Sequence, residues 1–226
     1  MAVSMFHCNE IARAIRLVCQ GASALSQDVS GGTQISVGSN ELFEAGQQVR
    51  VRDSAGEETA TVAQKVGLTT IVLSSALTGE YLVSRGARIE RAGGELPELQ
   101  WVGQGSPELM PRSPAERYPC VLVKPHRLLQ PLNEGSNRTF QHDYSFKVYY
   151  VECYEEGQQA NIEALERAGA IFNAIMDDPY LGGSCWHSQV TEVDPEPVVQ
   201  ARLREAERPL RVVEMTVLAR RAAVYG

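Results

Sequence analysis

The chain has 226 residues and a formal net charge of −7. This acidic balance argues against a surface built to grip nucleic acid, because such a surface carries an excess of lysine and arginine. No apolar run approaches the ~20 residues of a membrane-spanning helix, and residues 1–6 lack the basic and apolar regions of a signal peptide. We therefore expect a globular protein made in the cytosol.

Residues 8–20 are predicted to form an N-terminal helix. Apolar side chains recur at helical spacing along one side of it: Ile11, Ala14, Ile15 and Val18. Gly21 is a suitable end for this helix, because glycine tolerates the left-handed conformation that follows a helix.

Residues 28–94 are predicted to form an inserted β module. Short β-prone segments, separated by turns that contain glycine, recur along it: 35–37, 49–51, 59–62, 70–73, 81–83 and 87–89. Short strands at regular spacing indicate a small barrel or sandwich. The remaining residues, 1–27 and 95–226, are expected to form the core that carries this module.

Two strands are predicted in the second half of the chain. Residues 120–123 form a continuous apolar run, which is typical of a strand covered on both faces. Pro125 is expected to end that strand, and residues 128–138 are expected to form a loop tip. Residues 140–150 alternate between apolar and polar, which predicts a strand with one buried face. The side chains on that face are Phe140, Tyr144, Phe146, Val148 and Tyr150.

From about residue 159 the apolar period becomes that of a helix. Its stripe consists of Ile162, Leu165, Gly169, Phe172 and Met176, widened by Ala168, Ile171 and Ile175. Pro179 ends this helix, because the residue before a proline is pushed out of the α conformation. Residues 186–193 and 210–219 are predicted strands, whereas residues 198–208 fit a helical turn or a loop equally well.

These elements predict an α+β fold. A mostly antiparallel or mixed sheet is packed by the N-terminal helix and by one long central helix, and a small all-β module is inserted between residues 28 and 94.

The sequence offers little that could carry out chemistry. The five cysteines are scattered and form no CxxC pair, so free and mostly buried thiols are expected. Cys185 and His187 make at most half a metal site, because a closed zinc site needs four ligands. A set such as Cys120, His126 and Asp143 arises by chance in a chain with this many candidates. We predict no catalytic residue, no cofactor and no metal site, and therefore a protein that is not an enzyme.

The order of the core elements carries a resemblance. An opening helix is followed by Tyr118-Pro119-Cys120-Val121-Leu122-Val123, a long strand over residues 139–152, a helix, the phrase Asp177-Asp178-Pro179-Tyr180-Leu181, and two further strands. This order resembles the tail terminator proteins of long-tailed bacteriophages. The resemblance covers residues 1–27 and 115–220, and the β module has no counterpart in a minimal terminator.

The resemblance implies a structural virion protein. In that family a ring, usually a hexamer, caps the tail tube, ends tube polymerisation and joins the tail to the head-side connector. The protein would lie in the tail or neck of the virion after assembly in the host cytoplasm. Its partners would be copies of itself, the tail tube protein and the head-side connector or adaptor, with a sheath or collar contacting the β module. DNA would pass through the lumen without specific binding, which an acidic wall favours.

For such a ring, we expect subunit contacts on exposed edges of the long strand and the last strand, around Tyr149, Arg220 and Arg221. Arg138, at the loop tip, is expected to contact the tube. The alternatives are a head–tail connector, a stopper or another neck protein, and, from other classes, a cysteine-dependent hydrolase or a carbohydrate-binding module carried by the insert.

Overall fold

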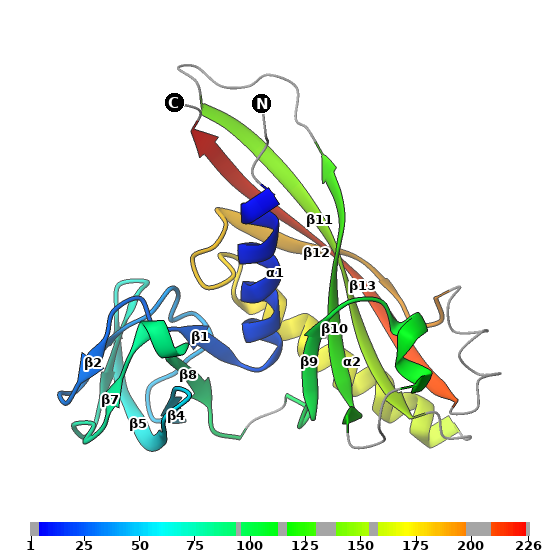
Figure 1. Ribbon diagram of the computed structural model, residues 1–226. Helices are drawn as coiled ribbons and strands as arrows, with labels where there is room; N and C mark the ends of the chain where they lie inside the picture. The colour runs from blue at the N-terminus through cyan, green and yellow to red at the C-terminus, as the bar shows by residue number, and fades with distance from the viewer. Residues whose placement is uncertain are drawn as a thin grey trace.

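The computed structural model describes residues 5–93, 96–112, 117–129, 139–153, 158–197 and 209–224. Over these residues the chain forms two α-helices, a six-stranded β-barrel and a five-stranded sheet (Figure 1). The prediction of an α+β fold with a β module is confirmed. Within the described residues, no helix combines the length and the hydropathy that crossing a membrane requires.

The first helix, α1, spans Met5–Cys19. Its predicted apolar side is buried, with Ile11 and Ile15 fully inaccessible to solvent. Gly21 follows the helix with a φ of +65°, and a Cβ placed on it would lie 2.9 Å from Leu96 Cδ1. Both the backbone conformation and the close contact therefore favour glycine at this end of α1.

The β module is an antiparallel barrel. Its strands, in the order in which they pair, are β1 (Ala22–Ala24), β8 (Arg88–Arg91), β4 (Gln48–Arg52), β5 (Glu57–Val66), β6 (Thr70–Leu73) and β3 (Gln34–Ser36). A bridge between Leu25 and Val37 brings the first and last of these strands together. The N–H of Gly38 donates to the carbonyl of Ala24 at 3.1 Å and helps to close the barrel.

The barrel also includes elements that the sequence pattern missed. Strand β1 lies before residue 28, where the module was predicted to begin, and its Ala-Ser-Ala sequence contains none of the β-branched residues that mark strands. A small ladder, β2 (Val29–Ser30) with β7 (Glu80–Tyr81), and the 3₁₀ turn η1 (Val83–Arg85) complete the module.

The five-stranded sheet forms the other half of the molecule. Its order is β12 (His187–Asp194), β13 (Leu210–Val224), β11 (Thr139–Cys153), β10 (Cys120–Leu129) and β9 (Trp101–Gln104). Every pairing is antiparallel except that of β9 with β10. The two edges of this sheet are therefore β12 and β9.

Strand β10 departs from one prediction. Residues 120–123 are buried as expected, but the strand continues past Pro125 to Leu129. A register shift between Pro125 and Arg127 marks a bulge opposite β11. Pro125 itself lies opposite Phe146, and His126 is the residue left out of the ladder. The pairing of β10 with β9 ends at Val123, so among the described strands Pro125 has a partner on one side only, where the missing N–H of a proline is tolerated.

Strand β11 is buried on both faces along part of its length. The predicted face, with Tyr144, Phe146 and Tyr150, packs in the main core. On the opposite face, Tyr149 and Val151 join a second cluster that also contains Met110 of the 3₁₀ helix η2 (Pro107–Arg112). The expectation of a single buried face is therefore wrong at this end of the strand.

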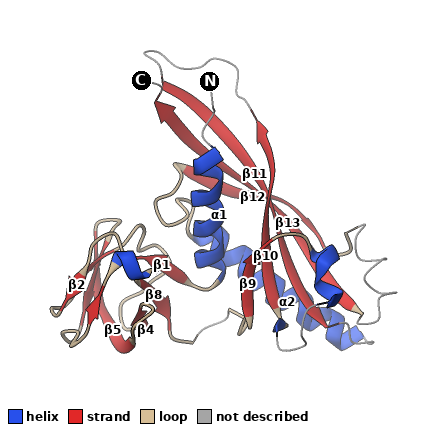
Figure 2. Ribbon diagram, viewed as in Figure 1, coloured by secondary structure: helices blue, strands red, loops and turns tan. Residues whose placement is uncertain are grey.

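Helix α2 spans Gln158–Asp177 and packs with α1 beside the sheet (Figure 2). Its core side is formed by Ala164, Ala168, Ile171, Ala174 and Ile175. The predicted stripe was centred too far to one side, because Ile162, Leu165 and Met176 are 43%, 41% and 42% exposed. Alanines let the helix approach the sheet closely, so the Ala/Ile edge faces the core and the larger side chains lie outside it.

The barrel and the sheet share one hydrophobic core, which runs from Ile35 and Ile89 through α1 to α2. A seam of glycines joins the two halves on another side. A Cβ on Gly38 would lie 2.0 Å from the carbonyl oxygen of Gly182, so the two backbones are in direct contact. Asp178 is fully buried near this seam, and its carboxylate accepts the N–H of Gly182 at 2.8 Å.

Candidate interaction groove

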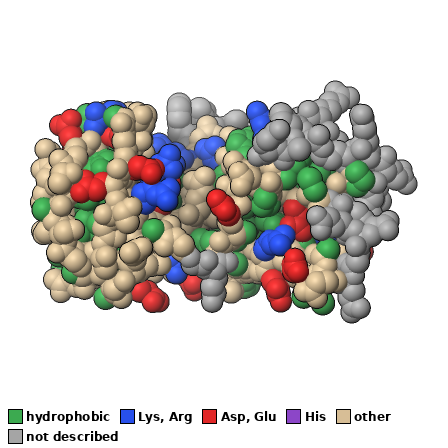
Figure 3. All heavy atoms as spheres, turned by 90° about the horizontal axis from the view of Figure 1, so that it is seen from below, with side chains coloured by type: hydrophobic (Ala, Val, Ile, Leu, Met, Phe, Trp, Pro, Cys, Tyr) green, Lys and Arg blue, Asp and Glu red, His purple; other side chains and the backbone are tan. Residues whose placement is uncertain are grey.

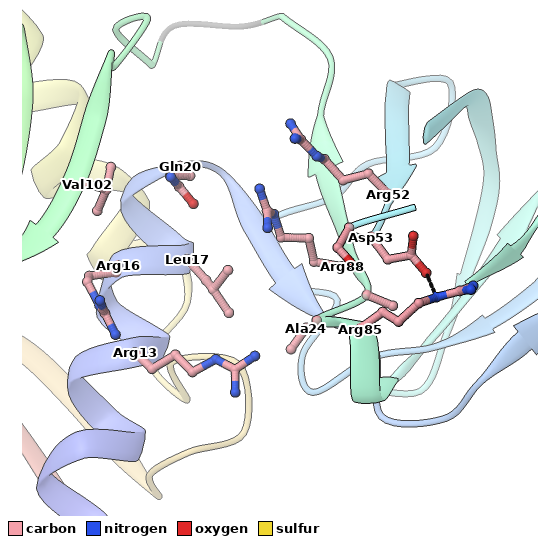
Figure 4. A pocket seen from close by; sticks show the side chains of 13 residues that line it. Arg13, Arg16, Leu17, Gln20, Ala24, Arg52, Asp53, Arg85, Arg88 and Val102 are labelled. Carbon is pink, nitrogen blue, oxygen red and sulfur yellow. Dashed lines mark hydrogen bonds and ion pairs between the residues drawn. The ribbon is translucent and has the colours of Figure 1, made fainter. Parts of the chain in front are cut away.

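An arginine-rich groove runs between α1 and the barrel. Arg13, Arg16 and Gln20 line it from α1, and Arg52, Arg85 and Arg88 line it from the barrel. The side chain of Arg13 points toward the barrel, whereas the guanidinium of Arg85 points away from α1 toward Asp53 (Figure 4). Apolar atoms of Leu17, Ala24 and Val102 also line this space. The hollow has a volume of about 350 Å³.

The groove continues into a second hollow of about 500 Å³, which shares Gln20, Arg52 and Arg88 with the first. Arg50 and Arg91 add two more arginines there. We call the two hollows together the arginine groove. Seven of the chain's 21 basic residues line it, against three carboxylates, those of Asp53, Glu90 and Glu98. Figure 3 shows Lys and Arg side chains gathered between the barrel and the rest of the chain.

The arginines on the barrel wall are held by internal partners. Arg85 Nε donates to Asp53 Oδ2 at 2.7 Å, and Arg88 Nε donates to Glu90 Oε1 at 2.5 Å. Desolvation raises the pKa of Asp53, but hydrogen bonds from the N–H groups of Ala55 and Leu82 and from Arg85 outweigh it and lower the pKa below its ordinary value. Asp53 is therefore a charged anchor for Arg85. Each guanidinium has five N–H donors, so one carboxylate leaves several available.

The arginines on α1 have no such partner. Among the described residues, no carboxylate lies within ion-pair distance of Arg13 or Arg16, and Arg16 Nε makes a 3.4 Å hydrogen bond to the carbonyl of Ala12. The Nε of Arg91 is buried without a hydrogen-bond partner in the described part of the chain. Uncompensated guanidinium groups around one hollow repel one another, and an anion bound among them relieves that repulsion.

The predicted interface residues lie elsewhere. Tyr149 is 7% exposed in the second cluster, and burial is the main cause that raises its pKa to about 12. Arg220 pairs with Asp143 at 2.9 Å, and Arg221 pairs with Glu10 at 2.5 Å. These arginines lie toward one end of β13, away from Glu214, which pairs with Tyr149.

The expected open edge is wrong at Tyr149 and Arg220, because each lies between two paired strands, whereas Arg221 has a strand partner only on its β11 side among the described residues. Contacts of Arg220 and Arg221 with another subunit stay a prediction. Arg138 lies outside the described residues.

The side chains considered for chemistry are not brought together. Cys120 lies opposite Val151, whereas Asp143 lies opposite Leu129 at the other end of the β10–β11 pair. Burial raises the pKa of Cys120 and of Cys185 to about 12, so both are thiols rather than nucleophilic thiolates near neutral pH. Within the described ranges, no three His, Cys, Asp or Glu side chains are grouped so that they could hold a metal ion.

The arginine groove was missed by sequence reasoning. Its arginines come from α1, β4, β8 and η1, and no two of them are adjacent in the sequence. The available signal was the alternation Arg50-Val51-Arg52, which places two arginines on the outer face of a strand. That signal predicts an exposed basic face, but it does not tell which element lies opposite.

Comparison of the sequence with protein-family models and with curated proteins finds no match.

Proposed function

We propose that the chain is a structural protein of a bacteriophage tail, which assembles head to tail into a closed ring at the end of the tail tube. Support comes first from the order of its core elements. An opening helix, the buried strand β10, the long strand β11, helix α2 and two further strands follow one another as the resemblance requires. In this role the ring ends tube growth by covering the last tube subunits and offers its other face to the head-side connector.

The observation that carries the proposal is that the five-stranded sheet ends in two edge strands, neither of which has a second strand partner in the described part of the chain. Strands β12 and β9 stand at opposite ends of its strand order. An edge strand favours pairing with another chain through N–H and C=O groups that no neighbouring strand uses. On β12 the N–H of Ser188 already donates to the carbonyl of Pro179 at 2.6 Å and that of Val190 to Met176 Sδ at 3.4 Å, which leaves the part of β12 toward Asp194 for such pairing. Contact between β12 of one copy and the β9 side of the next joins two different surfaces and is therefore head to tail, and such a contact gives a ring when its rotation closes.

Exposed apolar side chains lie on the elements at the β12 end of the sheet. Trp186, which precedes β12, is 57% exposed, and Val193 on β12 is 45% exposed. Ile162, Leu165 and Met176 are exposed along α2, which packs against β12. Large apolar groups left in water are typical of surfaces that bind another protein. This favours β12 and the exposed side of α2 as one half of the subunit contact.

A cysteine-dependent hydrolase, the alternative from the enzyme class, is less favoured. A cysteine-dependent hydrolase needs a thiolate beside a base, and burial keeps Cys120 and Cys185 protonated. A head–tail connector remains a neighbouring structural role, which differs from a terminator in its partner: portal or adaptor protein instead of tube protein.

The test is the native mass of the purified protein over a range of concentrations, alone and with the tail tube protein, followed by negative-stain imaging. We expect a ring that binds tube ends. A protein that stays monomeric at high concentration and does not bind tube ends would overturn the proposal. Binding to the portal or adaptor protein alone would favour the connector role.

A matched pair of variants locates the contact. Trp186→Ala should weaken ring formation by tenfold or more in dissociation constant, since truncating a buried interface tryptophan costs about 2 kcal/mol or more. Leu68→Ala removes a side chain of similar exposure, 55%, from the turn between β5 and β6 and serves as the control. Equal effects of the two substitutions would exclude the β12 surface as the contact.

A further inference from the structure

We infer that the arginine groove of one copy receives the acidic outer strand β12 of the next copy, with Glu192 and Asp194 as the carboxylates that pair with Arg13 and Arg16. This rests on the proposed head-to-tail ring and names the residues that hold neighbouring subunits in register.

The groove has the chemistry of a carboxylate receptor. Planar guanidinium groups bind carboxylates through two parallel N–H···O bonds, which fixes orientation as well as charge. Arg13 and Arg16 have no carboxylate partner among the described residues, and the Nε of Arg91 lacks an acceptor there. The same space is lined by apolar atoms of Leu17 and Val102, which suits a polypeptide segment better than a free inorganic ion.

Strand β12 has the complementary charge. The side chain of Glu192 is 67% exposed, and its nearest cation, Lys147 Nζ, is 4.0 Å away. Lys147 is held more closely by Glu214, at 2.5 Å. Asp194 stands opposite Glu214 in the ladder, two residues along the strand from Glu192. Glu192 and Glu214 therefore share one lysine, and Asp194, whose Oδ1 accepts the N–H of Glu196, has no cation within ion-pair distance among the described residues. This edge of the sheet keeps an excess of negative charge.

The placement of the two surfaces requires a second copy. Val102 of β9, one edge strand of the sheet, lines the groove, whereas β12 is the opposite edge strand. In Figure 1, β12 ends on the side of the molecule away from the barrel. One chain therefore cannot bring its own β12 carboxylates to its own groove. A neighbour arranged head to tail can, and each copy then gives one acidic edge and receives another.

Nucleic acid is the competing anion. Its phosphates also pair with guanidinium groups, but Asp53, Glu90 and Glu98 line the same groove and repel a polyanion. The chain's net charge of −7 adds to that repulsion. These charges favour a segment with a few carboxylates over a continuous phosphate backbone.

The test is charge reversal with rescue, read by sedimentation equilibrium of the full chain. The double variant Arg13→Glu, Arg16→Glu and the single variant Glu192→Arg should each raise the dissociation constant between subunits about tenfold or more. Mixing the two proteins should restore association between them, because each then carries the charge that the other lacks. Association of the wild type should also weaken as salt rises, since salt screens exposed ion pairs.

One control variant and three possible outcomes test the contact between the arginine groove and β12. Arg127→Glu reverses an exposed arginine on β10, outside the groove, and should leave association and melting temperature unchanged. If the wild type and all variants form rings equally well, this inference is wrong, but the proposed ring is not. A wild type that never associates overturns both. Binding of fluorescent duplex DNA that the Arg13→Glu, Arg16→Glu variant loses would assign the groove to phosphate instead.

Discussion

Replacing Gly38 by alanine tests the seam at which the barrel meets the turn after α2. A Cβ on Gly38 would lie 2.0 Å from the carbonyl oxygen of Gly182 and 2.9 Å from its carbonyl carbon. Observed Cβ contacts are essentially never below 3.0 Å, so the two backbones must separate by about 1 Å. Neither atom belongs to a flexible side chain that could move aside.

The cost can be bounded from this geometry. Forcing an extra methyl group into a packed site costs about 1–3 kcal/mol. For a chain of this length each kcal/mol lowers the melting temperature by about 2–4 °C, so the expected loss is about 2–12 °C. The displacement also pulls on the hydrogen bond from the N–H of Gly38 to Ala24, which helps to close the barrel.

Thermal unfolding followed by circular dichroism measures this loss. Gly56→Ala makes the same chemical change at a turn where a Cβ meets nothing within 4 Å, so its melting temperature should match the wild type or rise slightly. If Gly38→Ala and Gly56→Ala have the same melting temperature, the backbones of Gly38 and Gly182 are not in close contact.

Three further predictions concern the core, a buried acid and the thiols. Ile171→Ala should lower the free energy of unfolding, measured in urea, by about 2–5 kcal/mol, and Ile162→Ala should lower it much less. Equal losses would contradict the orientation of α2. Burial raises the pKa of Asp178, so the charged form is disfavoured in the fold. The stability of Asp178→Asn relative to the wild type should therefore increase as pH rises above about 4 through the raised pKa, and a flat difference would refute this. A thiol reagent should label exposed Cys153 in the native protein, and it should reach the three buried thiols only after unfolding: Cys19, Cys120 and Cys185.

The arginine groove depends on where the barrel is placed in the chain. The barrel follows α1 directly, so the outer side of that helix, although still exposed to water at Arg13 and Gln20, lies opposite the barrel. Arg13 and Arg16, which the sequence pattern places on the polar side of the helix, therefore line one wall of the groove. The groove that we propose for subunit contact is therefore a consequence of where the barrel is inserted.

Local pattern determined several elements of this protein. The apolar side of α1 and its end at Gly21 follow from helical spacing and from the conformational freedom of glycine. The burial of residues 120–123 follows from a continuous apolar run, and the β module follows from short segments between turns. In each case the interaction that decides the structure lies within a few residues along the chain.

The tertiary structure alone decided which strands are edges, which side of α2 faces the core, and which arginines share a groove. Strand β12 pairs with β13, so the last strand of the chain is interior, and no residue type marks an unpaired backbone edge. Alanines on α2 set its approach to the sheet through packing with residues distant in the sequence. Arg13 and Arg88 line the same groove because β1 and β8 pair beside α1. These features depend on contacts between distant segments, which a local pattern does not contain.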